Sequence, residues 1–124
     1  MIGGGTGGIS CAVEASKLGL HTALFNYVEP SPRGTTWGIG GTCTNVGCIP
    51  KKLFHRAAHL DFLLKNSVDY GWEADLKKQH NWQILRANVQ SYIKKMNFGY
   101  TAKLTESNVD FINAKASFES PHAV

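Results

Sequence analysis

The sequence has no apolar run of membrane-spanning length, no long basic run and only three cysteines in 124 residues. A membrane-spanning helix needs about 20 apolar residues, so we expect no membrane segment, and no signal peptide precedes the first glycines. The net charge of +4 is spread over short lysine pairs, which indicates a solvated surface rather than a nucleic-acid site. Three cysteines are too few for a secreted disulfide scaffold, so a cysteine pair here is more typical of an intracellular catalytic or metal site.

Glycine is abundant, and ten of the 13 glycines lie before residue 42. Gly3, Gly5 and Gly8 form the pattern G-x-G-x-x-G, followed by apolar residues at helical spacing and by a short buried strand over residues 22–26. In such a turn the first glycine permits a tight bend, the second lets the backbone approach a pyrophosphate, and the third lets the helix pack closely. Free amides near Thr6 and Gly7 would meet the phosphate charge.

The pattern predicts a partial doubly wound α/β domain over residues 1–124, because only Met1 and Ile2 remain of the strand that should precede the glycines. An acidic residue that would bind ribose hydroxyls is expected about 20 residues after the turn, and Asn26 occupies that position. Its amide oxygen can accept a hydrogen bond but lacks the charge. Cys11 lies in the apolar helical stretch, and we expect it to be a small buried hydrophobe.

The rest of the chain is predicted to contain a Gly/Pro loop over residues 29–41, two helices and at least one strand. The first helix should run from about Val46 or Ile49 to Lys65, with its apolar face formed by Ile49, Leu53, Ala57, Leu60 and Leu64. Asn81 is expected to cap the second helix. The apolar face of that helix carries Trp82, Leu85, Val89, Ile93, Met96 and Tyr100. Residues 109–114 are predicted to return as a strand, and residues 116–118 are a candidate start of another.

Cys43 and Cys48 stand five positions apart in "GTCTNVGCIPKK" and could form a redox pair, a metal clamp or two ordinary thiols. A metal set completed by His55 and His59 is implausible, because Cys48 and His55 would lie about 10 Å apart along a helix axis, whereas zinc lies only ~2.0–2.3 Å from its ligands. We therefore expect no metal.

A disulfide between Cys43 and Cys48 would need a broken helical turn. In a regular helix residues five apart have Cα atoms roughly 8.6 Å apart, and a disulfide requires about 7 Å or less. Asn45 and Gly47 tolerate the unusual dihedral angles of such a break. A loop this short gains little from chain entropy, which suits a pair that cycles, and Lys51 with a nearby helix start would favour thiolates. Two reduced thiols remain the alternative.

Together, the glycine turn and "GGTCTNVGCIPKK" closely resemble the flavin-binding start of the pyridine nucleotide–disulfide oxidoreductases, whose hallmark is G-G-T-C-x-N-x-G-C-x-P-x-K. The long loop "YVEPSPRGTTWGIGG" looks like that of animal thioredoxin reductase or thioredoxin–glutathione reductase. "YGW" at residues 70–72 and "NFGY" at residues 97–100 extend the resemblance over essentially the whole chain. The sequence departs from the family where Asn26 replaces an aspartate and Thr44 replaces a usual valine.

The resemblance implies an FAD- and NADPH-dependent relay in which electrons reach the Cys43–Cys48 disulfide and pass on to thioredoxin. It makes Cys48 the flavin-facing thiol, Cys43 the outer interchange thiol, and Lys51 a cation near the reactive edge of the flavin. Tyr100 matches a tyrosine that lies at the substrate disulfide in the family. An equally weighted alternative is that Tyr100 is only an aromatic residue of the helix's core face. The positions that the glycine turn and the resemblance assign to the cofactor are Gly3, Gly5, Thr6, Gly7, Gly8, Asn26, Tyr27, Thr42, Cys43, Gly47, Cys48, Lys51, Lys115 and Ala116.

Family members are homodimers that also contain an NADPH domain and an interface domain, and neither is expected within these residues. The expected partners are thioredoxin or a small disulfide such as glutathione disulfide, with no nucleic acid and no membrane. The compartment stays open between cytoplasm and mitochondrion. The alternatives are a flavin-binding module without turnover and an inactive truncated product, and we expect this chain alone to be inactive.

Overall fold

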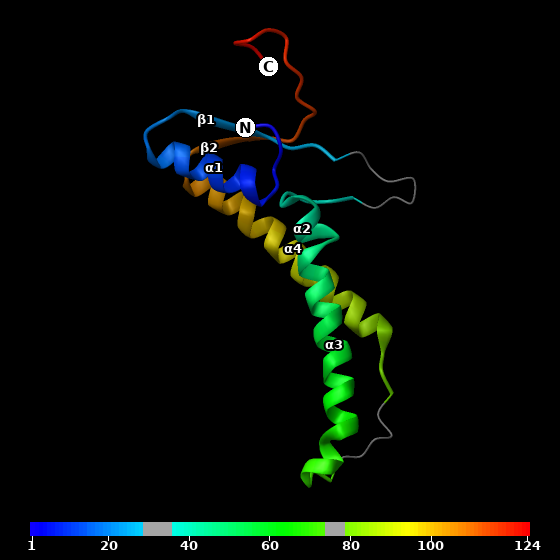
Figure 1. The fold of residues 1–124 in the computed structure, drawn as a ribbon. Helices are drawn as coiled ribbons and strands as arrows, with labels where there is room; N and C mark the ends of the chain where they lie inside the picture. The colour runs from blue at the N-terminus through cyan, green and yellow to red at the C-terminus, as the bar shows by residue number, and fades with distance from the viewer. Residues whose placement is uncertain (29–35, 74–78) are drawn as a thin grey trace.

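The computed structural model describes residues 1–28, 36–73 and 79–124. Two parallel strands, β1 (Thr22–Phe25) and β2 (Val109–Ile112), pair in register from Thr22 opposite Val109 to Phe25 opposite Ile112. Helices α1 (Thr6–Lys17) and α4 (Trp82–Glu106) contact both the strands and each other, and they lie together beneath the strands in Figure 1. The predicted α/β architecture is confirmed.

The start of the chain forms a short parallel pairing with the free edge of β1. Ile2 bridges Phe25, the Gly3 amide donates to the Phe25 carbonyl at 2.8 Å, and the Phe25 amide donates to the Met1 carbonyl at 2.8 Å. The next amide, that of Asn26, faces the opposite way and donates to Ile112 of β2 at 3.0 Å. Because the backbone amides of successive strand residues face opposite edges of the strand, β1 lies between β2 and the first residues, an order that doubly wound sheets contain.

The core lies between these strands and the two helices. Leu24 of β1 and Leu104 of α4 are fully buried, and the other members come from α1, β2 and the segment before residue 41. They are Ile9, Ala12, Val13, Ile39 and Val109. The core therefore fixes the glycine turn, which precedes α1, against the strands.

Cys11 is exposed, so the prediction that it is buried was wrong. Ile9, Ala12 and Val13 supply the buried side of α1. At about 100° per residue, Cys11 points roughly 200° from Ile9 and so faces away from the sheet. An apolar helical stretch has an outer face too, and Cys11 lies on it.

The cysteine region contains two helices, α2 (Gly41–Asn45) and α3 (Cys48–Asn66), followed by a 3-10 turn, η1 (Ser67–Tyr70). The short α2 was not predicted, and it takes the last residue of the expected loop 29–41, of which residues 29–35 lie outside the described chain. Residues 116–118 form no strand, so that candidate was wrong. A strand needs a partner strand for its backbone hydrogen bonds, and among the described residues the only pairing beyond β2 is an isolated bridge between Ser120 and Ala123.

The apolar faces of α3 and α4 are buried only in part. Leu60 and Leu64 of α3 are 47% and 46% exposed, and Trp82 of α4 is 52% exposed, although the spacing predicted all three on packed faces. Burial is confirmed for Val89 and Ile93. Figure 1 shows why: the far half of α3 extends away from the strands, beyond the reach of the core. At the start of α4, the Asn81 side chain accepts from the Ile84 amide at 3.1 Å, which confirms the predicted cap.

Candidate redox and cofactor site

The two cysteines lie on either side of a helix break. Helix α2 ends at Asn45, Val46 and Gly47 adopt non-helical angles (φ/ψ of −140°/6° and −120°/−112°), and α3 begins at Cys48. The broken turn that the five-residue spacing demands is therefore present. Cys43 is half-buried and Cys48 is exposed, and both are free thiols.

Gly47 allows the two helices to approach each other at this break. A Cβ at this position would lie 2.9 Å from the Thr42 carbonyl oxygen and 3.3 Å from the Cys43 Cα. The first distance is shorter than carbon–oxygen contacts normally allow, and both partners are backbone atoms. The sequence indicated that Gly47 tolerates unusual dihedral angles. The structure shows a second reason for glycine, which is that its backbone packs closely against the backbone of Thr42 and Cys43.

The pKa of Cys43 lies above its ordinary value, mainly through a hydrogen bond to the Cys48 side chain. Desolvation and the charge of Cys48 also raise this pKa, whereas a backbone hydrogen bond from Cys48 and the charge of Lys51 lower it. A bond that raises a thiol's pKa is one that the thiol donates. Cys43 therefore keeps its proton to higher pH than a free cysteine, and the stability that this bond contributes is lost as the pH rises through the raised pKa.

Thr44, between the cysteines, is fully buried, and its hydroxyl is the one buried side-chain polar atom of the described residues without a hydrogen-bond partner. Burying an unpaired hydroxyl costs about 1–3 kcal/mol.

We expect Thr44→Val to raise the free energy of unfolding by about 1 kcal/mol, because valine fills a similar volume without the unpaired hydroxyl. Chemical denaturation of the reduced chain measures this. Thr42→Val, at an exposed position of the same helix, is the matched control and should change stability by less than about 0.5 kcal/mol. A loss of stability in Thr44→Val would show that the hydroxyl has a partner in solution.

The glycine turn and the cysteine motif meet through their backbones. The Gly40 amide donates to the Gly4 carbonyl at 2.8 Å, Gly5 bridges Gly40, and a Cβ on Gly41 would lie 2.9 Å from the Gly5 Cα. Gly3 and Gly41 have positive φ angles of 108° and 67°, which glycine adopts at little cost. The structure thus brings the glycine turn and the start of the cysteine motif together although they are far apart in sequence.

The start of α1 presents backbone amides as predicted for a phosphate site. The cap residue of α1 is Gly5, which has no side chain to bond the first amides of the helix. Thr6 and Gly7, at the start of the first turn, are exposed. A Cβ on Gly7 would meet no described atom within 4 Å, so this end of the helix is open. Open amides and the positive end of the helix dipole suit a pyrophosphate.

Asn26 lies at the end of β1 and is only 9% exposed. Its side-chain oxygen accepts from the Gly4 amide at 3.2 Å, and a Cβ on Gly4 would clash with the Asn26 side chain at 2.7 Å. The residue expected to bind ribose therefore also holds the glycine turn. The sequence did not reveal this second contact.

Next to Asn26, a cavity of about 290 Å³ opens at the carboxyl ends of the two strands. It is lined by Ile2, Gly3, Phe25, Tyr27, Ala114, Lys115 and Ala116. Tyr27, Lys115 and Ala116 were singled out from sequence as cofactor contacts, and they share this cavity despite nearly 90 residues between them. Ligands of open α/β sheets bind beyond the carboxyl ends of the strands.

Tyr100 takes the core position that the sequence allowed, and its place at a substrate disulfide stays a prediction. It packs against the core, with its ring near Gly40, where a Cβ would lie 3.0 Å from Cε2. It also lines a hollow of about 390 Å³ along α4. The hollow is also lined by Met96, which the sequence placed on the same apolar face as Tyr100. Its other residues were not singled out from the sequence, although they share one helix face with Tyr100; they are Tyr92, Lys95, Gly99 and Lys103.

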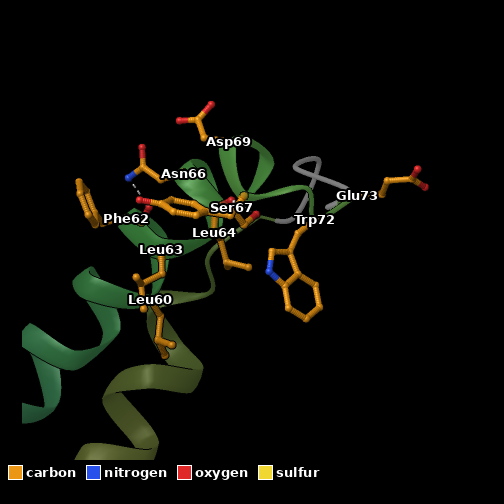
Figure 2. A pocket seen from close by; sticks show the side chains of 10 residues that line it. Leu60, Phe62, Leu63, Leu64, Asn66, Ser67, Asp69, Trp72 and Glu73 are labelled. Carbon is orange, nitrogen blue, oxygen red and sulfur yellow. Dashed lines mark hydrogen bonds between the residues drawn. The ribbon is translucent and has the colours of Figure 1, made fainter.

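A cavity of about 860 Å³ lies at the far end of α3, and leucines, Tyr70 and Trp72 are among the residues that line it. In Figure 2, Trp72 lies opposite Leu64 across this hollow. Sixteen residues of α3 separate Leu64 from Cys48, which is about 24 Å along a helix. Despite its size, this cavity is therefore too far from the thiols to take part in their chemistry.

No group of three or more His, Cys, Asp or Glu side chains that could hold a metal occurs within residues 1–28, 36–73 and 79–124. In the same residues, every helix is too short or too polar to cross a bilayer.

The chain is similar to known proteins over its whole length. The chain is 49% identical to "Thioredoxin reductase SEP1" of Emiliania huxleyi over 124 residues, which is 100% of this chain and 25% of that protein. It is 48% identical to "Thioredoxin reductase" of Plasmodium falciparum (isolate FCH-5) over 125 residues, covering 100% of this chain and 23% of that protein. The chain thus spans about a quarter of the length of these relatives. The family described as pyridine nucleotide-disulphide oxidoreductase matches residues 1–124, and the chain belongs to that family.

Proposed function

We propose that the chain is the FAD-binding, disulfide-bearing part of an NADPH-dependent thioredoxin reductase. The observation that carries the proposal is the placement of two free thiols, Cys43 and Cys48, on either side of a helix break, with Lys51 in the first turn of α3. The names of the two relatives support thioredoxin, rather than glutathione disulfide, as the acceptor. The proposal also includes a relation to the animal enzymes, which the long loop resembles. It further includes a homodimeric whole protein and a cytoplasmic or mitochondrial location.

The residues present fit FAD. The adenine end would lie in the cavity of Tyr27, Lys115 and Ala116, and the pyrophosphate would bind at the open start of α1. The reactive end would face Thr42 and the run from Gly47 to Lys51, which the Gly4–Gly40 contact brings beside the glycine turn. When bound, FAD would supply the electrons that reduce the cysteine pair.

The chemistry of the chain's own residues is thiol–disulfide exchange. Cys43 first loses its thiol proton to water, and the resulting thiolate attacks one sulfur of the acceptor disulfide, so that the other acceptor sulfur leaves as a thiolate and takes up a proton from water. The Cys48 thiolate then attacks Cys43, which closes the Cys43–Cys48 disulfide and releases the acceptor with two electrons and two protons gained. Lys51 stabilises the negative charge that develops on the sulfurs. Cys48 is exposed, so its sulfur is accessible to a cofactor.

We expect the purified chain to bind one FAD, seen as quenching of flavin fluorescence. After partial reduction, the visible spectrum of the flavin bound to Cys48→Ser should differ from that of the unmodified chain. The spectrum of Cys43→Ser should match that of the unmodified chain. Cys11→Ser, at an exposed site on α1, is the matched control and should behave as the unmodified chain. Folded chain without flavin binding, or equal spectra for Cys48→Ser and the control, would contradict the proposal.

The acceptor is tested with the whole protein that contains this chain. NADPH-driven reduction of thioredoxin should exceed that of glutathione disulfide by more than tenfold. The reverse preference would establish the glutathione alternative.

A further inference from the structure

The amide of Asn45, in the middle of the cysteine motif, has all of its hydrogen bonds made inside the protein. The side chain is 7% exposed, and its Nδ2 donates to the Gly38 carbonyl at 2.9 Å and to the Gly41 carbonyl at 2.8 Å. Its Oδ1 accepts from the Gly38 amide and from Asn97 Nδ2, both at 3.2 Å. Two donors and two lone pairs are the full capacity of such an amide. The sequence interpretation had Asn45 and Gly47 tolerate the unusual dihedral angles of the break, whereas in the structure Asn45 is the last residue of α2, and Val46 and Gly47 form the break.

Asn97 connects this amide to α4, 52 residues away in sequence. Its Nδ2 donates to the Ile39 carbonyl at 2.6 Å as well as to Asn45. Asn97 reaches these partners because residue 38 is glycine: a Cβ there would lie 2.4 Å from the Asn97 Cγ. Asn97 therefore ties together three separate segments, namely the backbone of residues 38–41, α2 and α4.

Helix α2 needs such support. It has five residues, and isolated helices shorter than about 12–15 residues are marginal in water. Its residue Cys43 must stay next to Cys48, the first residue of a different helix, for the two thiols to bond. Whatever holds α2 in place therefore sets the distance between the two sulfurs.

We propose that Asn97 is a positioning residue that holds α2, through Asn45, where Cys43 stays within bonding reach of Cys48. The inference rests on the proposed function in that this pair is the redox centre. By restricting the freedom of α2, the Asn97 contacts raise the effective concentration of one thiol at the other. They thereby favour both the thiol–thiol hydrogen bond and the disulfide.

The test is the equilibrium of the 124-residue chain with glutathione, in which two glutathione thiols reduce the Cys43–Cys48 disulfide and yield one glutathione disulfide. Asn97→Leu removes both donations at similar volume, and Gly38→Ala displaces the unchanged Asn97 side chain. We expect each variant to make the disulfide about tenfold easier to reduce, as loss of one or two hydrogen bonds implies. The double variant should add little to the larger single effect, because both changes break the same contacts.

A second readout is the pH dependence of Cys43 alkylation in the reduced chain, with exposed Cys11 as a reference thiol in the same sample. In both variants the pKa of Cys43 should fall towards its ordinary value, because the donated bond to Cys48 is weakened. Asn66→Leu is the matched control: it removes a side-chain amide bonded to the Phe62 carbonyl at 2.8 Å on α3, and both readouts should stay unchanged.

Two outcomes would overturn the proposal: folded Asn97→Leu and Gly38→Ala chains with the original equilibrium and Cys43 titration, or an equal shift in Asn66→Leu. Circular dichroism establishes that each chain is folded, and Gly38→Ala, which keeps every side chain of the network, is the milder variant. Neither readout needs FAD, NADPH or thioredoxin. Failure of the proposed function would therefore show in flavin binding and turnover, and failure of this inference would show in the thiol equilibrium.

Discussion

Gly8→Ala is expected to lower the free energy of unfolding by about 3 kcal/mol and to abolish FAD binding. A Cβ on Gly8 would lie 1.9 Å from the Gly3 carbonyl oxygen, a backbone atom in the tight turn. Neither side of this contact has a flexible side chain that could move away. Helix α1 would have to shift from the turn, which would displace the amides that meet the phosphate.

Gly7→Ala provides the matched control for Gly8, because both are in the first turn of α1 and a Cβ on Gly7 meets no described atom within 4 Å. Alanine should there keep or raise stability by up to about 1 kcal/mol, the helix propensity that glycine lacks. Chemical denaturation and FAD titration of the two variants test this. Equal stabilities would show that the turn relaxes around a side chain at Gly8.

Gly47→Ala is expected to lower the free energy of unfolding by about 2 kcal/mol and to make the Cys43–Cys48 disulfide at least tenfold easier to reduce. The added Cβ would meet the Thr42 carbonyl at 2.9 Å and the Cys43 Cα at 3.3 Å. Relief of this contact moves α2 away from α3, and the two sulfurs move apart with their helices. Denaturation and the glutathione equilibrium measure the two effects.

Gly99→Ala is the control for Gly47→Ala. Gly99 lies within α4, and a Cβ there meets no described atom within 4 Å, so alanine should stabilise the helix by about 0.5–1 kcal/mol and leave the disulfide unchanged. If Gly47→Ala instead leaves the glutathione equilibrium unchanged while stability falls, the close approach at Gly47 supports folding alone.

Features that depend on neighbouring residues were predictable from the sequence. The glycine pattern gave the turn before α1, Asn81 gave the start of α4, and the five-residue spacing of the cysteines required a broken helix. Each follows from backbone sterics or helix geometry over a few positions. The family resemblance added the likeness of Tyr27, Lys115 and Ala116 to cofactor contacts, and these residues do share a cavity.

Features that depend on distant residues were decided only by the tertiary structure. Periodicity defines the apolar face of a helix but not how much of that face a neighbour covers, and Leu60 and Leu64 are half-exposed because α3 extends beyond the core. The link from Asn97 to Asn45 joins residues 52 positions apart, and no local pattern specifies it. The sequence by itself determined the spacing of the cysteines and the resemblance to a family, whereas the packing of α4 against α2 brought Asn97 to Asn45.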